Sequence, residues 1–418
     1  MKHGQITVFI ILAIVLLVVA GSMLFLVRSA AEKNAATEAK KSKGTAFETE
    51  PIENYIMGCL DRVSKDAIEK LYSQGGYIYS SQGGTLLDHT PQSRGADFAE
   101  YSGNNVNYLI YPPRLAFGSG YRENSQAPKY PWEFFPHKPL QGSQSPDLIT
   151  ESTEGFFGIS NLPPLDEKDS PHSFRNQLES YVRNNIAKEC ALDIFSEHGT
   201  DITTGNPVAN VTITDTAVVF SLSWPAHIEN GQTAESANLE RFTKMQDIRL
   251  RKIHSFMQGI ISNDIENISY DISSPANSED LFSISVIRDF SGKDDLVIAT
   301  DSKSRIDGKP LDFVFGRKNR MPALHYIVSS SQTIARCQTV TENFLTGGKS
   351  LKAPDPDEDI FTEASYRVQT VIPYNGPFPY AVPESAPPNF RPKFRISASD
   401  GNLEDYQDVE ILVSGDCP

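Results

Sequence analysis

Positive charge is scarce in this sequence of 418 residues. Lysine and arginine total 38 against 53 aspartates and glutamates, which gives a formal net charge of −15. A nucleic-acid-binding surface needs clustered positive charge to neutralise phosphates, so we expect no nucleic-acid partner. Cysteine is also scarce, since the sequence contains four. Four cysteines are too few for a cysteine-rich scaffold but enough for two disulfide bonds.

The sequence also lacks the short motifs that carry common enzyme chemistries. It has no His-Glu-x-x-His, no Gly-x-Ser-x-Gly, no phosphate-binding glycine loop and no Cys-x-x-Cys. The eight histidines are scattered, and His254 and His325 fall in a predicted helix and a predicted strand, where structural roles are commoner. We therefore predict that the protein is not an enzyme and requires no cofactor.

Charge is absent altogether from residues 6–27. As a helix, these 22 residues would span about 33 Å at 1.5 Å per residue, which is close to the thickness of the bilayer core. The small residues typical of a cleavage site lie inside the run rather than after it, which argues against a cleaved secretory peptide. We predict a retained membrane helix within residues 1–50, continued by a charged helical stalk.

The residues before this run are Lys2, His3, Gly4 and Gln5. A short basic leader, then Gly-Gln, then an unbroken apolar helix resembles the class III signal peptide of archaeal type IV pilin-like proteins. The resemblance implies cleavage between Gly4 and Gln5, retention of the apolar helix, and pilin-like subunits, surface proteins or glycans as partners. Pilins often carry Glu at the fifth mature position, where this chain has Phe9, which favours an anchor over a filament subunit. A plain signal anchor is the alternative.

Charge alone leaves the orientation open. Basic residues outnumber acidic ones just after the apolar run, which by the positive-inside rule would keep the body in the cytoplasm. Pilin-like leaders place the body outside instead, and two Asn-x-Ser/Thr sequons, at Asn210 and Asn267, are candidate glycosylation sites of a secreted body. We expect an extracytoplasmic, membrane-anchored body at the cell surface.

Helix and strand patterns alternate over residues 51–320 and predict an α+β body. Apolar residues recur at three- and four-residue spacing in three expected helices: 51–72, 170–190 and 239–261. Period-two alternation marks the expected strands: 208–213, 218–222, 282–286, 296–298 and 311–315. The repeated Ser-Gln-Gly-Gly at 73–76 and 81–84 predicts a small hairpin.

A loop-rich aromatic insertion interrupts this body at about 73–165. Aromatic rings dominate many binding surfaces, so we take Tyr108, Tyr111, Tyr130 and Trp132 as candidate residues for binding glycan or protein. The alternative is an irregular cover that buries these rings against the helices.

Residues 321–418 show mainly strand and turn signals, over a length that fits an immunoglobulin-like sandwich. The acidic stretch at 355–362 resembles a turn of extracellular Ig-like and cadherin-like repeats, and residues 394–413 resemble their final hairpin. The resemblance implies an all-β Ig-like module.

Acidic residues in this module raise one metal hypothesis. Asp355, Asp357 and Asp359 would meet Asp400 and Asp405 if the sandwich brings their turns together. Calcium prefers six to eight oxygen ligands from such groups, so calcium is the one candidate cofactor. Two solvated acidic turns are the alternative.

The four cysteines allow three pairings. Cys59 and Cys190 lie on apolar helix faces in the central body, while Cys337 and Cys417 flank the strands of the C-terminal module. Pairing Cys59–Cys190 and Cys337–Cys417 lets each module fold independently, and four free thiols in a reducing compartment are the alternative.

These features favour a membrane-anchored, pilin-like surface protein, a minor or tip pilin that projects an Ig-like module for adhesion. The alternative is a membrane-tethered component of an envelope enzyme or secretion complex.

The leader generates the first testable prediction. If a prepilin peptidase processes the chain, N-terminal sequencing of the membrane-bound protein should return Gln5. Recovery of Met1 from the envelope would reject pilin-type processing and leave the anchor standing, whereas a full-length cytoplasmic protein would reject both.

Overall fold

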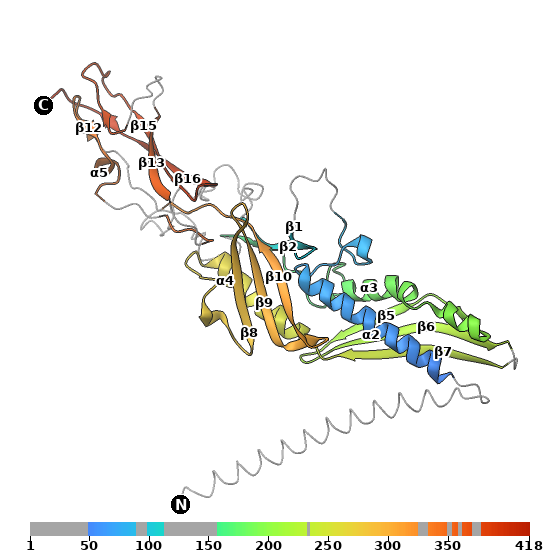
Figure 1. Ribbon diagram of the computed structural model, residues 1–418. Helices are drawn as coiled ribbons and strands as arrows, with labels where there is room; N and C mark the ends of the chain where they lie inside the picture. Colours follow the sequence, from blue (N-terminus) through green and yellow to red (C-terminus); the bar gives the residue numbers. More distant parts are fainter. Residues whose placement is uncertain are drawn as a thin grey trace, which may run out of the picture. The chain divides into compact units, whose positions relative to one another are not determined.

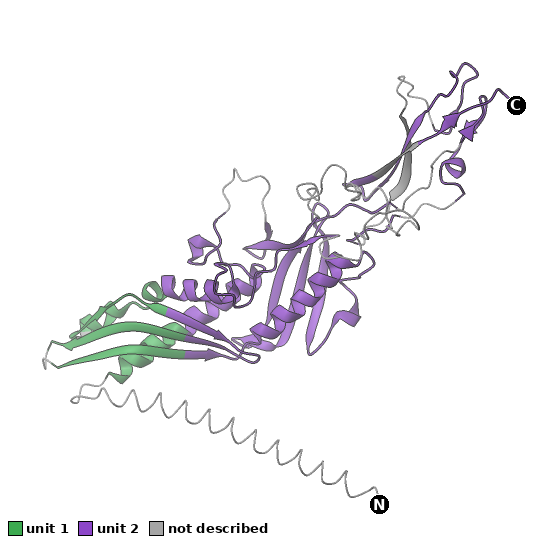
Figure 2. Cartoon of the chain, turned by 180° about the vertical axis from the view of Figure 1, so that it is seen from behind, with its two compact units in different colours: residues 1–60, 186–208, 221–243 green, residues 61–185, 209–220, 244–418 purple. Residues whose placement is uncertain are grey.

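The structure is a computed structural model that describes residues 49–88, 98–112, 157–231, 235–324, 333–348, 353–357, 362–369 and 378–418. The predicted leader, membrane helix and most of the stalk lie outside these ranges. No helix within the ranges is long and apolar enough to cross a membrane. The chain divides into two compact units, coloured separately in Figure 2. The first comprises 1–60, 186–208 and 221–243, and the second comprises 61–185, 209–220 and 244–418.

Helix α2 (Glu50–Ser73) confirms the first predicted helix. The predicted apolar residues are buried from Ile52 through Leu71, apart from the half-buried Tyr55. The helix ends at two glycines with positive φ, where Gly76 N donates to Leu71 O over 2.8 Å. A Cβ on Gly76 would lie 2.6 Å from the Phe174 ring, so both the turn and the close approach require glycine here.

Helix α3 (Phe174–Glu189) begins later than predicted. The sequence places the start at Ser170–Pro171, but the capping residue is Ser173, whose Oγ accepts a hydrogen bond from Asn176 N at 3.3 Å. Several residues near the start compete for the cap, and only the tertiary position of the chain selects one.

The third predicted helix, 239–261, is partly wrong. Its first half is strand β7 (Ser236–Gln246), which pairs with β6 (Val218–Asn230), and helix α4 (Leu250–Glu266) begins only afterwards. Met245 lies in this stretch and is 50% exposed, because alternation along the strand turns it away from the core. Pairing with the preceding strand outweighed the local helical spacing.

Strand β6 (Val218–Asn230) is central to a four-stranded sheet and pairs with β4 (Thr200–Thr204), β5 (Val208–Ile213) and β7. Within the first unit, the indole of Trp224 donates to Gly205 O at 3.0 Å. Also within this unit, a disulfide joins Cys59 to Cys190. The covalent link ties α2 to the end of α3.

The second unit contains a larger sheet in the order β1-β2-β10-β9-β8, shown in Figure 1. Its strands are β1 (Phe98–Tyr101), β2 (Asn104–Tyr111), β8 (Phe282–Ser291), β9 (Asp294–Ile306) and β10 (Lys309–Arg317), and β3 (Ile159–Ser160) pairs with β2. The β2–β10 pair is parallel and the others are antiparallel. Helix α4 packs on one face, where Phe256 stacks on Phe282 with ring centroids 4.9 Å apart.

The small hairpin predicted at 73–84 is absent. A 3-10 turn (Ser80–Gln82) lies there instead, with one isolated bridge between Tyr79 and Leu86. Side chains of α3 bind the backbone groups that a hairpin would have paired. Asn184 Nδ2 donates to Gly83 O at 2.9 Å, and Ile78 N donates to Gln177 Oε1 at 2.6 Å.

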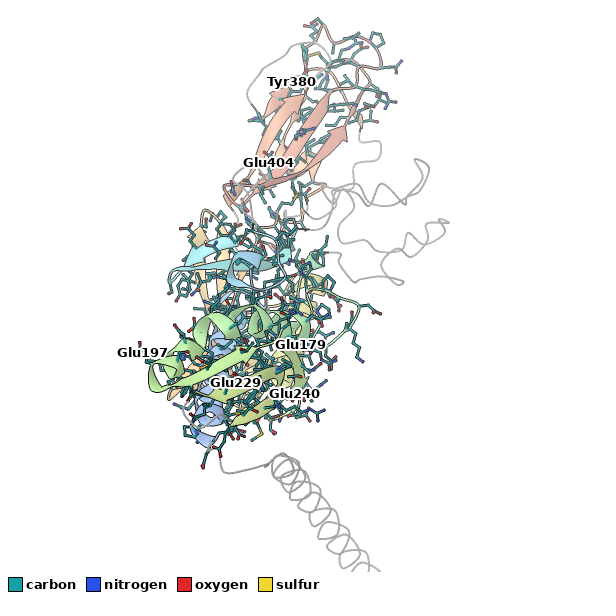
Figure 3. The ribbon with its side chains drawn as sticks, turned by 90° about the vertical axis from the view of Figure 1, so that its right-hand side faces the viewer. Glu179, Glu197, Glu229, Glu240, Tyr380 and Glu404 are labelled. Carbon is teal, nitrogen blue, oxygen red and sulfur yellow. A yellow bond between two sulfur atoms is a disulfide. The ribbon has the colours of Figure 1, made fainter. Side chains whose placement is uncertain are left out.

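Among the described residues, the C-terminal strands form three small sheets, and the Ig-like sandwich stays a prediction. The strands are β11 (Thr333–Ile334), β12 (Thr339–Val340), β13 (Thr362–Gln369), β14 (Tyr380–Ala381), β15 (Lys393–Ser399), β16 (Glu404–Glu410) and β17 (Leu412–Val413). They pair as β13-β15-β16, β11-β17 and β12-β14, and a one-turn helix, α5 (Glu342–Leu345), was not predicted. The core includes Tyr380, which is labelled in Figure 3, and Phe394, and the Cys337–Cys417 disulfide lies in the same region. The mixture of helices and strands is as expected, and both expected cysteine pairs are present.

The two disulfides generate a stability prediction. The paired cysteines are 131 and 80 residues apart. Closing loops of these lengths stabilises the folded state by at most about 5 and about 4.5 kcal/mol on the chain-entropy treatment. The Cys59→Ala/Cys190→Ala and Cys337→Ala/Cys417→Ala double variants should each unfold at lower denaturant than the parent protein.

The reduced parent protein is the matched control for these variants. Under reducing conditions the difference between parent and variants should shrink. Unchanged unfolding midpoints under oxidising conditions would contradict a stabilising role for the disulfides.

Candidate functional site

The aspartates predicted to bind calcium have other partners. Asp357 accepts from Arg320 Nε at 2.9 Å, Asp400 from Asn319 Nδ2 at 2.8 Å, and Asp405 from Leu324 N at 2.6 Å. Asp355 accepts from the backbone N of Asp357 at 2.7 Å, and Asp359 lies outside the described residues. Within the described part of the chain, no group of three or more His, Cys, Asp or Glu residues is placed to hold a metal ion. A protein donor binds at least one oxygen of each of the four described aspartates, and these four do not gather into a metal-ligand group.

These contacts converge on residues 317–324, which we call the junction segment. It begins at the last residue of β10 and includes the boundary that we predicted between the body and the C-terminal module. Asp357, Asp400 and Asp405 reach it from the C-terminal side, and Asp294 reaches it from β9, accepting from Asn319 N at 2.9 Å. All of these residues belong to the second unit. The junction segment is thus bound by carboxylates from both of the regions that it connects.

Two buried arginines lie at the centre of these contacts. Arg317 pairs with Asp264 of α4 at 2.9 Å and with Asp295 of β9 at 2.6 Å. Arg320 pairs with Asp264 at 2.8 Å and with Asp357 at 2.7 Å. Both arginine side chains are fully buried. The two guanidinium groups therefore join α4, β9 and the 353–357 segment.

A third arginine balances the charge. Arg288 Nη1 lies 2.9 Å from Asp295 Oδ2 and also donates to Asp357 O at 2.7 Å. We call this group of three arginines and three aspartates the arginine–aspartate cluster: Arg288, Arg317, Arg320, Asp264, Asp295 and Asp357. Its formal charges sum to zero, which is the condition under which buried ions are tolerated.

Burial and pairing act in opposite directions on the cluster. Burial alone would lower the pKa of Arg317, but the carboxylates of Asp264, Asp357 and Asp295 outweigh it and raise that pKa. The pKa of Arg320 is likewise raised, with burial opposing Asp264 and Asp357. Both arginines stay charged at every pH at which the protein is folded. The cluster therefore joins these elements through paired charges.

Tyr108 was a candidate binding residue and is buried instead. It is 2% exposed, its hydroxyl donates to Asp294 at 2.8 Å, and Lys318 Nζ lies 3.8 Å from its ring centroid. Burial and then Asp294 raise the pKa of Tyr108. The prediction of an exposed binding ring is therefore wrong for Tyr108, because its hydroxyl and its ring are both used to position the junction segment.

The other aromatic candidates differ in status. Tyr111 is half-buried and packs edge-on against Tyr108 with ring centroids 6.2 Å apart. Tyr130 and Trp132 lie outside the described residues. A role for Tyr111 at a surface therefore stays a prediction.

Both predicted glycosylation asparagines are exposed. Asn210 lies in β5, and Asn267 caps the C-terminal end of α4. Their hydroxyl residues, Thr212 and Ser269, are exposed as well.

The histidines that were predicted to have structural roles are His254 and His325. His254 is buried, its Nε2 donates to Pro163 O at 2.9 Å, and burial lowers its pKa, so it has the structural role expected for it. His325 lies outside the described residues.

A hollow of about 310 Å³ is lined by Asp66, Glu69, Lys70, Tyr72, Ser73, Asn104, Leu311 and Asp312. Its lining contains no histidine or cysteine that would pair with a nucleophile.

Sequence reasoning missed Arg317, Arg320, Asp264 and Asp295. One signal was available, since Arg317-Lys318-Asn319-Arg320 places three cations at and just beyond the end of a buried strand. Buried charges need partners, so this run pointed to nearby carboxylates without showing which ones.

Comparison with known proteins finds no family profile and no curated protein that matches this sequence.

The cluster generates a stability prediction. Arg320→Met keeps the side-chain length but leaves Asp357 and Asp264 short of a cation, so it should destabilise the fold by about 3–5 kcal/mol in denaturant unfolding. Arg391 pairs with Glu410 at 3.1 Å on the surface. The matched control Arg391→Met should cost less than about 1 kcal/mol.

A double variant sharpens this test. Arg320→Met/Asp357→Leu removes both partners of one pair and should be more stable than Arg320→Met alone. Equal costs for Arg320→Met and Arg391→Met would contradict the importance of the cluster.

Proposed function

We propose that this protein is a membrane-anchored, pilin-like protein of the cell surface, a minor or tip subunit that presents an Ig-like C-terminal module for adhesion. The observation that carries the proposal is the leader, in which Lys2-His3-Gly4-Gln5 precedes 22 residues without charge. Such a run is long enough to stay in the bilayer as a helix. Other pilin-like subunits, surface proteins and glycans are its proposed partners.

The disulfides support an extracytoplasmic body. Cys59–Cys190 and Cys337–Cys417 lie in different parts of the chain, and the described residues include no free cysteine. Disulfides persist in oxidising compartments and are rare in the cytoplasm. They therefore oppose the orientation that the basic residues after the apolar run favour.

The arginine–aspartate cluster supports a presenting role for the second unit. A surface module that binds a partner must stay attached when the partner moves. Asp357, Asp400 and Asp405 bind the junction segment from the C-terminal side, so separating these residues from β10 would expose unpaired charges.

Size favours a minor or tip subunit. The residues after the apolar run number about 390 of the 418, which is bulky for a subunit repeated along a filament. The apolar helix would still pack with those of smaller pilin-like subunits at the filament base or tip.

Immunogold labelling of intact cells, combined with a leader variant, tests the proposal. Label should lie at the cell surface, at filament tips or bases. Gly4→Leu should block processing and remove the label from filaments, because the leader remains attached. Gly21→Leu, a matched control inside the apolar run, should be processed and located normally.

Other labelling patterns would favour other functions or locations. Filaments composed mostly of this chain would overturn the minor-subunit assignment. Label over the envelope without filaments would favour a membrane-tethered component of an envelope enzyme or secretion complex. Label confined to the cytoplasm would overturn the proposal as a whole.

A further inference from the structure

The two Asn-x-Ser/Thr sequons have different backbone conformations. They are Asn210-Val211-Thr212 and Asn267-Ile268-Ser269, and no third sequon occurs in the sequence. Exposure does not separate them, since the asparagine and the hydroxyl residue are exposed in both. Their secondary structure does.

The first sequon is held in a sheet. All three of its residues lie within β5, which pairs with β6. Val211 is 3% exposed, and its backbone N donates to Glu179 Oε1 of α3 at 2.9 Å. The extended strand keeps Asn210 and Thr212 on one face, about 7 Å apart along the chain. Bending this segment would break its pairing and expose Val211.

The second sequon is free of any strand. Asn267 terminates α4, and the next strand, β8, begins only at Phe282. The side-chain Oδ1 of Asn267 accepts from Ser269 N at 3.0 Å, which folds the amide back toward the hydroxyl residue. No described residue accepts a hydrogen bond from its Nδ2, so the nucleophilic nitrogen is accessible.

A glycosyl transferase that recognises this motif must bind the amide of the asparagine and the hydroxyl two residues later at the same time. A bent sequon in an exposed turn presents both groups together, and a sequon fixed in a strand does not. Acceptor sequons accordingly belong in surface loops. The geometry therefore ranks Asn267 far above Asn210.

We infer that Asn267 carries an N-linked glycan and that Asn210 does not. The donor class is a glycan linked through phosphate to a polyprenyl lipid. The bond between the anomeric carbon and the phosphate oxygen breaks, a bond from that carbon to Nδ2 forms, Nδ2 loses one proton, and the lipid phosphate leaves. The inference rests on the proposed function, because it requires an extracytoplasmic body.

Peptide mass spectrometry of protein purified from the membranes of its native cells tests this inference. Cleavage after lysine and arginine places the sequons on separate peptides, 189–241 and 253–288. The expected result is a mass increase of one glycan on 253–288, fragmenting to Asn267, with 189–241 unmodified.

Variants assign the modification to the sequon. Ser269→Ala keeps Asn267 and its turn, which uses the backbone N of residue 269, but removes the hydroxyl, so the mass increase should disappear. Ser269→Thr should retain it. Ser283→Ala lies on the same peptide outside any sequon and should have no effect.

The same digest, run without reductant, separates failure of this inference from failure of the proposed function. An unmodified Asn267 in protein whose four cysteines are disulfide-bonded would overturn the glycosylation and leave the surface assignment standing. A glycan on Asn210 alone would overturn the structural ranking. Free cysteines in a cytoplasmic, unglycosylated protein would overturn both proposals.

Discussion

The burial of Arg317 and Arg320 is the constraint on which the second unit depends. Each guanidinium group is fully removed from solvent, and such a transfer costs several kcal/mol unless carboxylates in fixed positions compensate. The compensating carboxylates are Asp264 of α4, Asp295 of β9 and Asp357 of the 353–357 segment. Arg317 contacts all three carboxylates, and Arg320 contacts Asp264 and Asp357. The cluster therefore couples α4 and the central sheet to the 353–357 segment.

The cluster also explains how an acidic turn is neutralised in a chain of net charge −15. Carboxylates in a buried acidic turn need a neutralising cation, which either a metal ion or a protein side chain can supply. Here the protein provides its own cation, since Arg320 reaches Asp357 through Nε, Nη2 and the backbone N. Guanidinium is planar and donates in two directions, so it satisfies a carboxylate geometrically as well as electrostatically. Acidic composition alone does not distinguish these two ways of neutralising a turn.

The disulfides and the buried ion pairs stabilise the protein in different ways. Cys59–Cys190 lies in the first unit and Cys337–Cys417 in the second, and each lowers the entropy of the unfolded chain. The arginine–aspartate cluster acts on the folded state, where it makes partial opening costly. A protein exposed outside the membrane benefits from both. The glycan acceptor inferred at Asn267 lies at the end of α4, the helix whose Asp264 joins both buried arginines.

Local sequence patterns determined those features whose energetics are local. The apolar stripe of α2, the glycines that end it, the alternating strands β8 to β10 and the sequons were all legible in the sequence, and the cysteine positions favoured the pairing that is observed. Only the tertiary structure decided that 239–246 is a strand, that the backbone of Ile78 and Gly83 binds α3 side chains, and that Asp357 and Asp400 bind the junction segment. The partners of the 78–84 segment, of Asp357 and of Asp400 lie far away in the chain, whereas β7 pairs with β6, the strand just before it. Side-chain spacing fixes which face of an element is apolar, but the partner of a buried charge or an edge strand depends on which distant groups the fold brings within hydrogen-bonding distance.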